Sequence, residues 1–132
     1  MTYVVIRYMS YHDIVSLFMQ NVIFFQRGVI GDMKKSEPMS ESYYYILLCL
    51  SKGANHGYGI MQLTEELSRG EVTIGSGTMY GATSNMMRKG WIKEIVSNGV
   101  GMERRRLYCL TEAGEAALVA EIARLRRMLE CV

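Results

Sequence analysis

The pattern of hydrophobic and polar positions divides the chain at about residue 32. Residues 1–32 are rich in Val, Ile, Phe and Tyr, and their longest uncharged run spans residues 14–26. Ser16, Gln20 and Asn21 interrupt that run, which is shorter than the roughly 20 apolar residues of a membrane span. We therefore expect no membrane partner, and the missing small-residue cleavage site argues against a signal peptide.

Two interpretations remain open for residues 1–32. In the first, this segment does not belong to the natural protein, which begins at Met33, and Arg27-Gly28 or Gly31-Asp32 is a translated ribosome-binding tract. In the second, the segment is an amphipathic arm that packs on the domain. The intact mass of the protein from its native host distinguishes the two.

From Met33 onward the pattern predicts a regular order of elements. Apolar periodicity and capping residues predict helices over residues 43–53, 58–68 and 76–90, and a last helix from Thr111 to the end of the chain. Alternation and turn residues predict strands over residues 72–74, 91–97 and 104–110, with a turn at residues 98–101. Ser76 or Thr78 is expected to cap the third helix, and Gly90 to end it.

This order of elements is that of a winged helix-turn-helix. The fold class that we expect is mainly α with a small β-hairpin (α+β). Residues 33–110 are expected to form the winged helix domain, and residues 111–132 a C-terminal dimerisation helix.

The third predicted helix has an unusual composition. Met79, Ala82 and Met86 fall on one side, with Thr83 and Met87 partly beside them, and are expected to face the core. The opposite side is small and neutral, and no acidic residue occurs between residues 75 and 91. A helix that enters the major groove needs small residues, hydrogen-bonding groups and no carboxylates near phosphates. The candidate DNA-binding residues of this helix are Thr78, Tyr80, Gly81, Ser84, Asn85 and Arg88.

An alternative reading of this helix is a plain surface helix whose glycines are incidental. The predicted hairpin favours the DNA-binding interpretation, because three consecutive arginines, Arg104 to Arg106, follow its Gly-rich tip. Strand alternation places Arg104 and Arg106 on one face, where we expect them to contact phosphates. Arg105 points the other way and is expected to pair with a carboxylate such as Glu94 on the facing strand. The alternative for the hairpin is an edge strand protected by charge against aggregation.

Charge and candidate chemistry change this picture little. The net charge of +2 is too mild to indicate a nucleic-acid partner by itself. The three cysteines show no CxxC spacing and the two histidines do not lie near them, so we expect reduced thiols in the cytoplasm and no metal site. No nucleophile, phosphate-binding or cofactor motif is present, so we predict no enzyme activity and no cofactor. His56 is expected to stabilise a turn or to be merely solvated, rather than to act in catalysis.

Dimerisation is predicted from two helices. The first helix is apolar all round, so Tyr44 and Leu48 are expected to meet a partner chain. The last helix carries a narrow apolar stripe of Leu118, Ile122, Leu125 and Leu129 at heptad spacing. The alternative is that this stripe packs back on its own domain.

Residues 43–114 resemble the PadR family of bacterial transcriptional regulators. The residues that carry the resemblance are Tyr45-Ile46-Leu47, His56-Gly57-Tyr58-Gly59-Ile60, Gly77-Thr78-Met79-Tyr80-Gly81-Ala82, Lys89-Gly90-Trp91-Ile92 and residues 104–114. The resemblance implies a homodimeric repressor that binds palindromic promoter DNA and is released by a small, often aromatic or phenolic, effector. The single helix after the wing is similar to the short members of that family, whereas residues 1–32 depart from its pattern. A second function remains open, a winged helix that binds protein rather than DNA.

Overall fold

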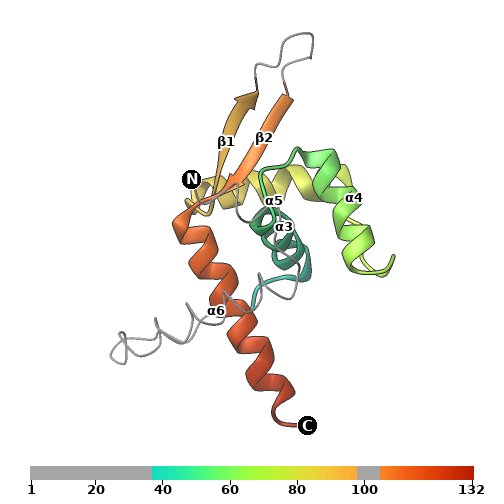
Figure 1. The fold of residues 1–132 in the computed structure, drawn as a ribbon, viewed down its shortest axis with the longest axis vertical. Helices are drawn as coiled ribbons and strands as arrows, with labels where there is room; N and C mark the ends of the chain where they lie inside the picture. The colour runs from blue at the N-terminus through green and yellow to red at the C-terminus, as the bar shows by residue number, and fades with distance from the viewer. Residues whose placement is uncertain (1–36, 98–104) are drawn as a thin grey trace. The chain divides into compact units, whose positions relative to one another are not determined.

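The structure is a computed structural model that describes residues 37–97 and 105–132. Its elements are, in chain order, α3 (Glu41–Ser51), α4 (Gly57–Leu67), α5 (Ser76–Arg88), β1 (Ile92–Ser97), β2 (Arg105–Leu110) and α6 (Glu112–Leu129) (Figure 1). This confirms the predicted fold class, a winged helix-turn-helix with helices and one antiparallel hairpin. Residues Met39–Leu118 form one compact unit and Val119–Val132 belong to a second. The predicted turn at residues 98–101 lies outside the described residues.

The core of the first unit is built from the apolar sides of all its elements. Helix α3 packs against α4 and β2, and it buries Ile46, Leu47, Cys49 and Leu50. Ser40 caps this helix, since its hydroxyl oxygen accepts a hydrogen bond from the Tyr43 N–H at 3.3 Å. The other buried apolar residues of the unit are Ile60, Ile74, Met79, Ala82, Met86, Ile92, Cys109 and Leu118. The hairpin therefore stands on a core that both of its strands help to form.

His56 begins α4 as its N-cap, which confirms the expected turn-stabilising role. The ring Nδ1 accepts a hydrogen bond from the Gly59 N–H at 3.1 Å. A side chain at Gly59 would collide with the side chains of Asn55 and His56, so this close cap needs glycine. The backbone of Asn55 in turn exchanges two hydrogen bonds with the backbone of Tyr108, of 3.0 and 2.8 Å. The loop before α4 is thereby tied to the wing.

The strand predicted at residues 72–74 is not formed. The hydroxyl of Ser68 instead holds this segment, accepting a hydrogen bond from the Val72 N–H at 2.9 Å. Ile74 anchors it by burying its side chain to 3% exposure. The residue pattern of this segment is that of a strand, but a strand needs a neighbouring strand to pair with. At Tyr108, β2 pairs with Asn55 instead, through an isolated antiparallel bridge.

A close contact at the base of the wing fixes the start of α6. The Thr111 hydroxyl donates to the carbonyl of Gly90 and accepts a hydrogen bond from the Gly114 N–H at 3.1 Å. Gly114 is buried, and a Cβ added there would meet the carbonyl group of Trp91. The predicted cap at Thr111 is therefore confirmed, and a glycine is required three residues later.

Candidate nucleic-acid interface

The two sides of α5 differ as the sequence predicts. Its buried residues are Met79, Ala82, Thr83 and Met86, which face the core. Thr83 satisfies its hydroxyl within the helix by donating to the Met79 carbonyl at 2.9 Å. Residues 76–78, Gly81 and Arg88 are exposed, and Tyr80 is exposed to 74%. Cβ atoms built at Gly77 and Gly81 meet nothing within 4 Å, so a second molecule can approach the backbone closely at these positions.

The first turn of α5 departs from the prediction. Gly75 is the N-cap, in an extended conformation, and makes no side-chain cap hydrogen bond. The expected caps Ser76 and Thr78 lie inside the helix, because the extended backbone that starts it already ends at Gly75. No acidic residue lies in this turn, and Arg88 lies in the last turn. The N–H groups at the start of α5 therefore have no side-chain cap, and the helix dipole gives that end a partial positive charge.

Asn85 does not face outward as expected. It is half-buried, and its Nδ2 atom donates a hydrogen bond of 2.7 Å to the Tyr43 hydroxyl on α3. The Oδ1 atom accepts a hydrogen bond of 3.4 Å from Arg88. Helix periodicity alone missed this contact because it depends on where α3 crosses α5. Ser84 is also half-buried.

The hairpin register corrects the predicted role of Arg105. Glu94 lies opposite Tyr108 and Val96 lies opposite Arg106, so Glu94 shares a strand face with Arg106 and not with Arg105. The carboxylate Oε1 of Glu94 is 3.2 Å from Nε of Arg106. The expected Arg105–Glu94 pair is therefore wrong, because the sequence did not reveal which residues the turn places opposite each other. Arg104 and the side chain of Arg105 lie outside what the structure describes.

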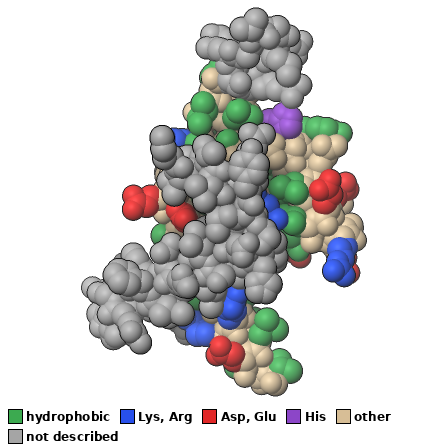
Figure 2. All heavy atoms as spheres, viewed as in Figure 1, with side chains coloured by type: hydrophobic (Ala, Val, Ile, Leu, Met, Phe, Trp, Pro, Cys, Tyr) green, Lys and Arg blue, Asp and Glu red, His purple; other side chains and the backbone are tan. Residues whose placement is uncertain are grey.

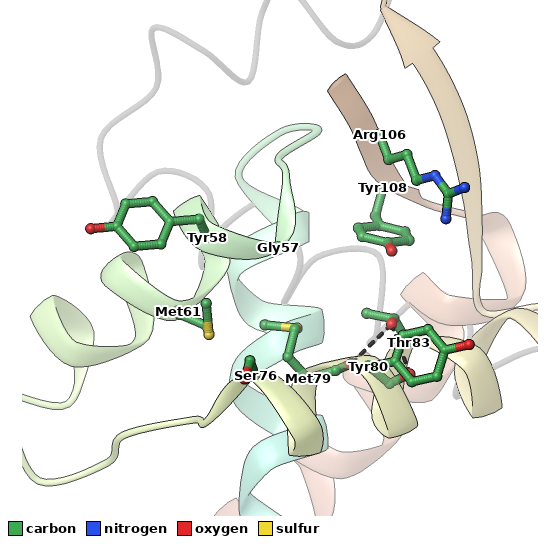
Figure 3. Close-up of a pocket in the computed structure, with 9 residues that line it drawn as sticks. All are labelled: Gly57, Tyr58, Met61, Ser76, Met79, Tyr80, Thr83, Arg106 and Tyr108. Atoms are coloured by element: carbon green, nitrogen blue, oxygen red, sulfur yellow. Dashed lines mark hydrogen bonds between the residues drawn. The ribbon is translucent and has the colours of Figure 1, made fainter. Parts of the chain in front are cut away.

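Arg106 and α5 lie on the two sides of one cavity. This cavity has a volume of about 220 Å³ and is lined by Gly57, Tyr58, Met61, Ser76, Met79, Tyr80, Thr83, Arg106 and Tyr108. Figure 3 shows Tyr108 and Arg106 extending from β2 on the side of α5, where the Tyr80 ring lies. The wing thus presents its described arginine beside the exposed face of α5. The sequence did not indicate the aromatic residues Tyr58 and Tyr108 that line this space.

Side chains of both charges are visible on one face of the molecule. On the part of the face in Figure 2 that the grey residues leave visible, acidic and basic side chains lie at separate places. Near the C-terminal end of α5, the Lys89 ammonium lies 4.6 Å from the centre of the Trp91 ring. An interaction with a polyanion would therefore depend on a few positioned cations rather than on net charge.

The three cysteines lie in different environments. Cys49 and Cys109 are buried and Cys131 is exposed, and all three are free thiols. Burial raises the pKa of the Cys49 thiol, which disfavours the reactive thiolate. Across the described ranges, no group of three or more His, Cys, Asp or Glu side chains could hold a metal ion. Among those same residues, no helix has the length and apolar character to cross a membrane.

The predicted dimerisation residues differ in exposure. Leu118 is only 1% exposed in the single chain, which argues against a place at a subunit interface. Leu129 is 71% exposed. Tyr44, Leu48, Ile122 and Leu125 are half-buried. The Tyr44 ring meets the Tyr45 ring edge-on, with centroids 5.5 Å apart.

Comparison with known families gives the class of the protein. The profile of the transcriptional regulator PadR-like family matches residues 46–120, which is more than half of the chain. The chain therefore belongs to the PadR-like family, and it is a transcription regulator with the family's DNA-binding winged helix.

Solved structures agree with this assignment. A PadR family transcription regulator from hypervirulent Clostridium difficile R20291 is 30% identical, with a TM-score of 0.60 over 70% of this chain and 94% of that chain. A transcriptional regulator from Clostridium thermocellum is 20% identical, with a TM-score of 0.60 over 81% of this chain and 92% of that one. Bacillus subtilis PadR, solved in complex with operator DNA, is 24% identical, with a TM-score of 0.55 over 62% and 46% of the two chains. No curated protein gives a significant match.

Proposed function

We propose that this protein is a repressor that binds a palindromic promoter sequence as a homodimer, with α5 as its reading helix. The observation that carries the proposal is the exposed face of α5, which is small, free of carboxylates and flanked by Arg106 across a cavity. An α-helix fits the major groove of B-DNA only where its side chains allow close approach. Gly77 and Gly81 provide that approach, since both are exposed and open.

The other candidate residues are suited either to base edges or to backbone phosphates. Thr78, Tyr80 and Ser84 carry hydroxyl groups that suit base edges or phosphates. Arg88 is exposed at the end of α5, and Arg106 is exposed to 76% on the wing. Both guanidinium groups are suited to backbone phosphates, and we assign Arg104 the same role from its strand parity. Asn85 is not counted among the residues that read bases, because the Tyr43 hydroxyl already accepts a hydrogen bond from its amide.

The proposed homodimer and the proposed palindromic binding site depend on each other through two-fold symmetry. Two-fold symmetry presents two reading helices about one helical turn apart, which matches two inverted half-sites. Half-buried Ile122 and Leu125 and exposed Leu129 supply apolar surface on α6 that a second copy would cover. Tyr44 and Leu48 on α3 are the other half of the proposed interface. Leu118 is not part of the proposed interface, because it is already buried within the single chain.

Control by a small effector rests on family membership alone. We infer that an aromatic or phenolic compound releases the dimer from DNA. Titration of candidate compounds into a preformed complex, followed by fluorescence anisotropy of labelled DNA, tests this step. Release at concentrations that leave the protein folded supports it, and retention of DNA with every compound that binds the protein contradicts it.

The experiment for the main proposal is selection of binding sequences from a pool of random duplexes. We expect an inverted repeat to be enriched, with affinity that falls steeply as salt rises, because phosphate contacts release counterions. Duplex DNA from the upstream region of the gene should contain the same repeat. Recovery of no sequence, together with salt-independent or absent retardation, would favour a winged helix that binds protein instead.

A further inference from the structure

A hydrogen-bonded group of three side chains joins α3 to the end of α5. Asn85 is its centre, donating to the Tyr43 hydroxyl at 2.7 Å and accepting from Arg88 at 3.4 Å. The orientation of the amide follows from Arg88, because a guanidinium group can only donate. The Oδ1 atom must therefore face Arg88, and the NH₂ group must face Tyr43.

This orientation leaves the Tyr43 hydroxyl with a proton to donate. Its oxygen accepts from Asn85, and no described residue accepts the hydroxyl proton. Tyr43 is half-buried and Arg88 is exposed, so a second molecule can reach both. The group thus offers a phenolic O–H and guanidinium N–H donors at the two ends of one amide, which suits an acceptor with several oxygens.

The position of the group on α5 determines what such an acceptor would be. Thr78, Gly81, Asn85 and Arg88 recur at helical spacing and form one stripe. Ser76, Tyr80 and Thr83 lie on another side of the helix, where they line the cavity with Arg106. The exposed face of α5 is therefore bordered by the wing on one side and by Tyr43 on the other.

A helix in the major groove has a sugar-phosphate backbone on each side. The wing side supplies Arg106 for one backbone, whereas Arg88, at the end of α5, lies on the Tyr43 side of the helix and is available for the other. We propose that Tyr43, together with Arg88, binds a backbone phosphate of the DNA strand opposite the wing, and that Asn85 holds the two donors in place. This inference rests on the proposed function and adds α3 to the DNA-binding surface. Tyr43 contacts the phosphate directly, and Asn85 is a positioning residue.

The test uses the full chain and removes one hydroxyl. Tyr43→Phe is expected to weaken binding to the selected operator and to random duplex alike by about tenfold, because a hydrogen bond to a charged group is lost. The slope of log affinity against log salt should stay the same, since tyrosine carries no charge. Arg88→Gln should lower that slope by about one. Tyr45→Phe is the matched control, because it removes a hydroxyl from the same helix roughly 200° around its axis from Tyr43, and it should bind as the wild type.

Single methylphosphonate substitutions then identify the phosphate. Each operator phosphate is replaced in turn by the uncharged group, and binding of the wild type, Tyr43→Phe and Arg88→Gln is compared. We expect one position at which the losses from the variants and from the neutral group are not additive. A Tyr43→Phe loss that adds in full at every position would mean that the hydroxyl acts only on the fold, and the proposal would be wrong.

Two further outcomes separate this inference from the proposed function. If Tyr43→Phe binds every duplex within twofold of the wild type, the phosphate contact is wrong while DNA binding stands. If the wild type binds no duplex, both proposals are wrong. If Tyr43→Phe fails to fold, the methylphosphonate comparison with Arg88→Gln still tests the proposal, because exposed Arg88 is predicted to contact the same phosphate. A loss from Arg88→Gln that adds in full at every position would then contradict the proposal.

Discussion

Glu94 on β1 and Arg106 on β2 form an ion pair across the wing, with 3.2 Å between Oε1 and Nε. The two residues are diagonal neighbours, since Glu94 lies opposite Tyr108 and Arg106 lies opposite Val96. Their side chains are 30% and 76% exposed, so the pair contributes at most about 1 kcal/mol to stability. Because the pair uses Nε, the terminal nitrogens of Arg106 keep their donors for a phosphate.

We therefore predict that Arg106→Gln weakens binding to operator and random DNA alike. The salt slope of log affinity should fall by about one, because one fewer counterion is released. The midpoint of urea unfolding should change little, since the ion pair is exposed. Lys93→Gln is the matched control, because it removes one positive charge from the opposite face of the same hairpin. A normal slope for Arg106→Gln with a lowered slope for Lys93→Gln would mean that the other face of the wing meets DNA.

Gly81→Ala should separate stability from function. An alanine there meets no atom within 4 Å and favours the helix by about 0.5–1 kcal/mol, so the free energy of unfolding should rise. The added methyl group should weaken operator binding if α5 approaches the base edges at this point. Urea unfolding and DNA titration of the same preparation measure both effects. A more stable variant with full affinity would show that DNA does not approach Gly81 closely.

Gly114→Ala should have the opposite effect on stability. Its new Cβ would collide with the backbone of Trp91 in a buried contact, so the free energy of unfolding should fall by about 1–3 kcal/mol. Trp91 is the single tryptophan of the chain, and its fluorescence can follow unfolding. Gly81→Ala provides the comparison, because the same substitution is made in a helix with open space. Equal stability for the two variants would contradict the close packing of Gly114, in the first turn of α6, against the backbone of Trp91.

Replacing both Ile122 and Leu125 with Asp should dissociate the proposed dimer. Both side chains are half-buried in the single chain, and burying a carboxylate at an interface costs several kcal/mol unless it is paired. Operator affinity should fall together with the dimer, whereas single-chain helix content should remain. Light scattering that still gives the mass of a full dimer would place the interface elsewhere.

Much of the fold follows from local sequence, whereas the site depends on contacts between distant residues. Caps at Ser40 and Thr111 were predictable because each acts on the turn that follows it. The core side of α5 was predictable because periodicity alone decides it. The partner of Glu94 depended on the hairpin register, which the turn sets, and the partner of Asn85 on the crossing of α3 and α5. Residues 72–74 have the composition of a strand, but in the described part of the chain they pair with no neighbouring strand.

The central claim is that the exposed face of α5 reads DNA, and Gly81→Glu tests it most directly. The side chain has space, so the protein should fold, but its carboxylate would lie where the groove and the phosphates are expected. Ala116→Glu adds the same charge at an exposed position of α6 and is the control. The measurement is the ratio of operator to random-DNA affinity at fixed salt. We predict that Gly81→Glu brings this ratio close to one while Ala116→Glu keeps the wild-type value; an unchanged ratio for Gly81→Glu would contradict reading by α5.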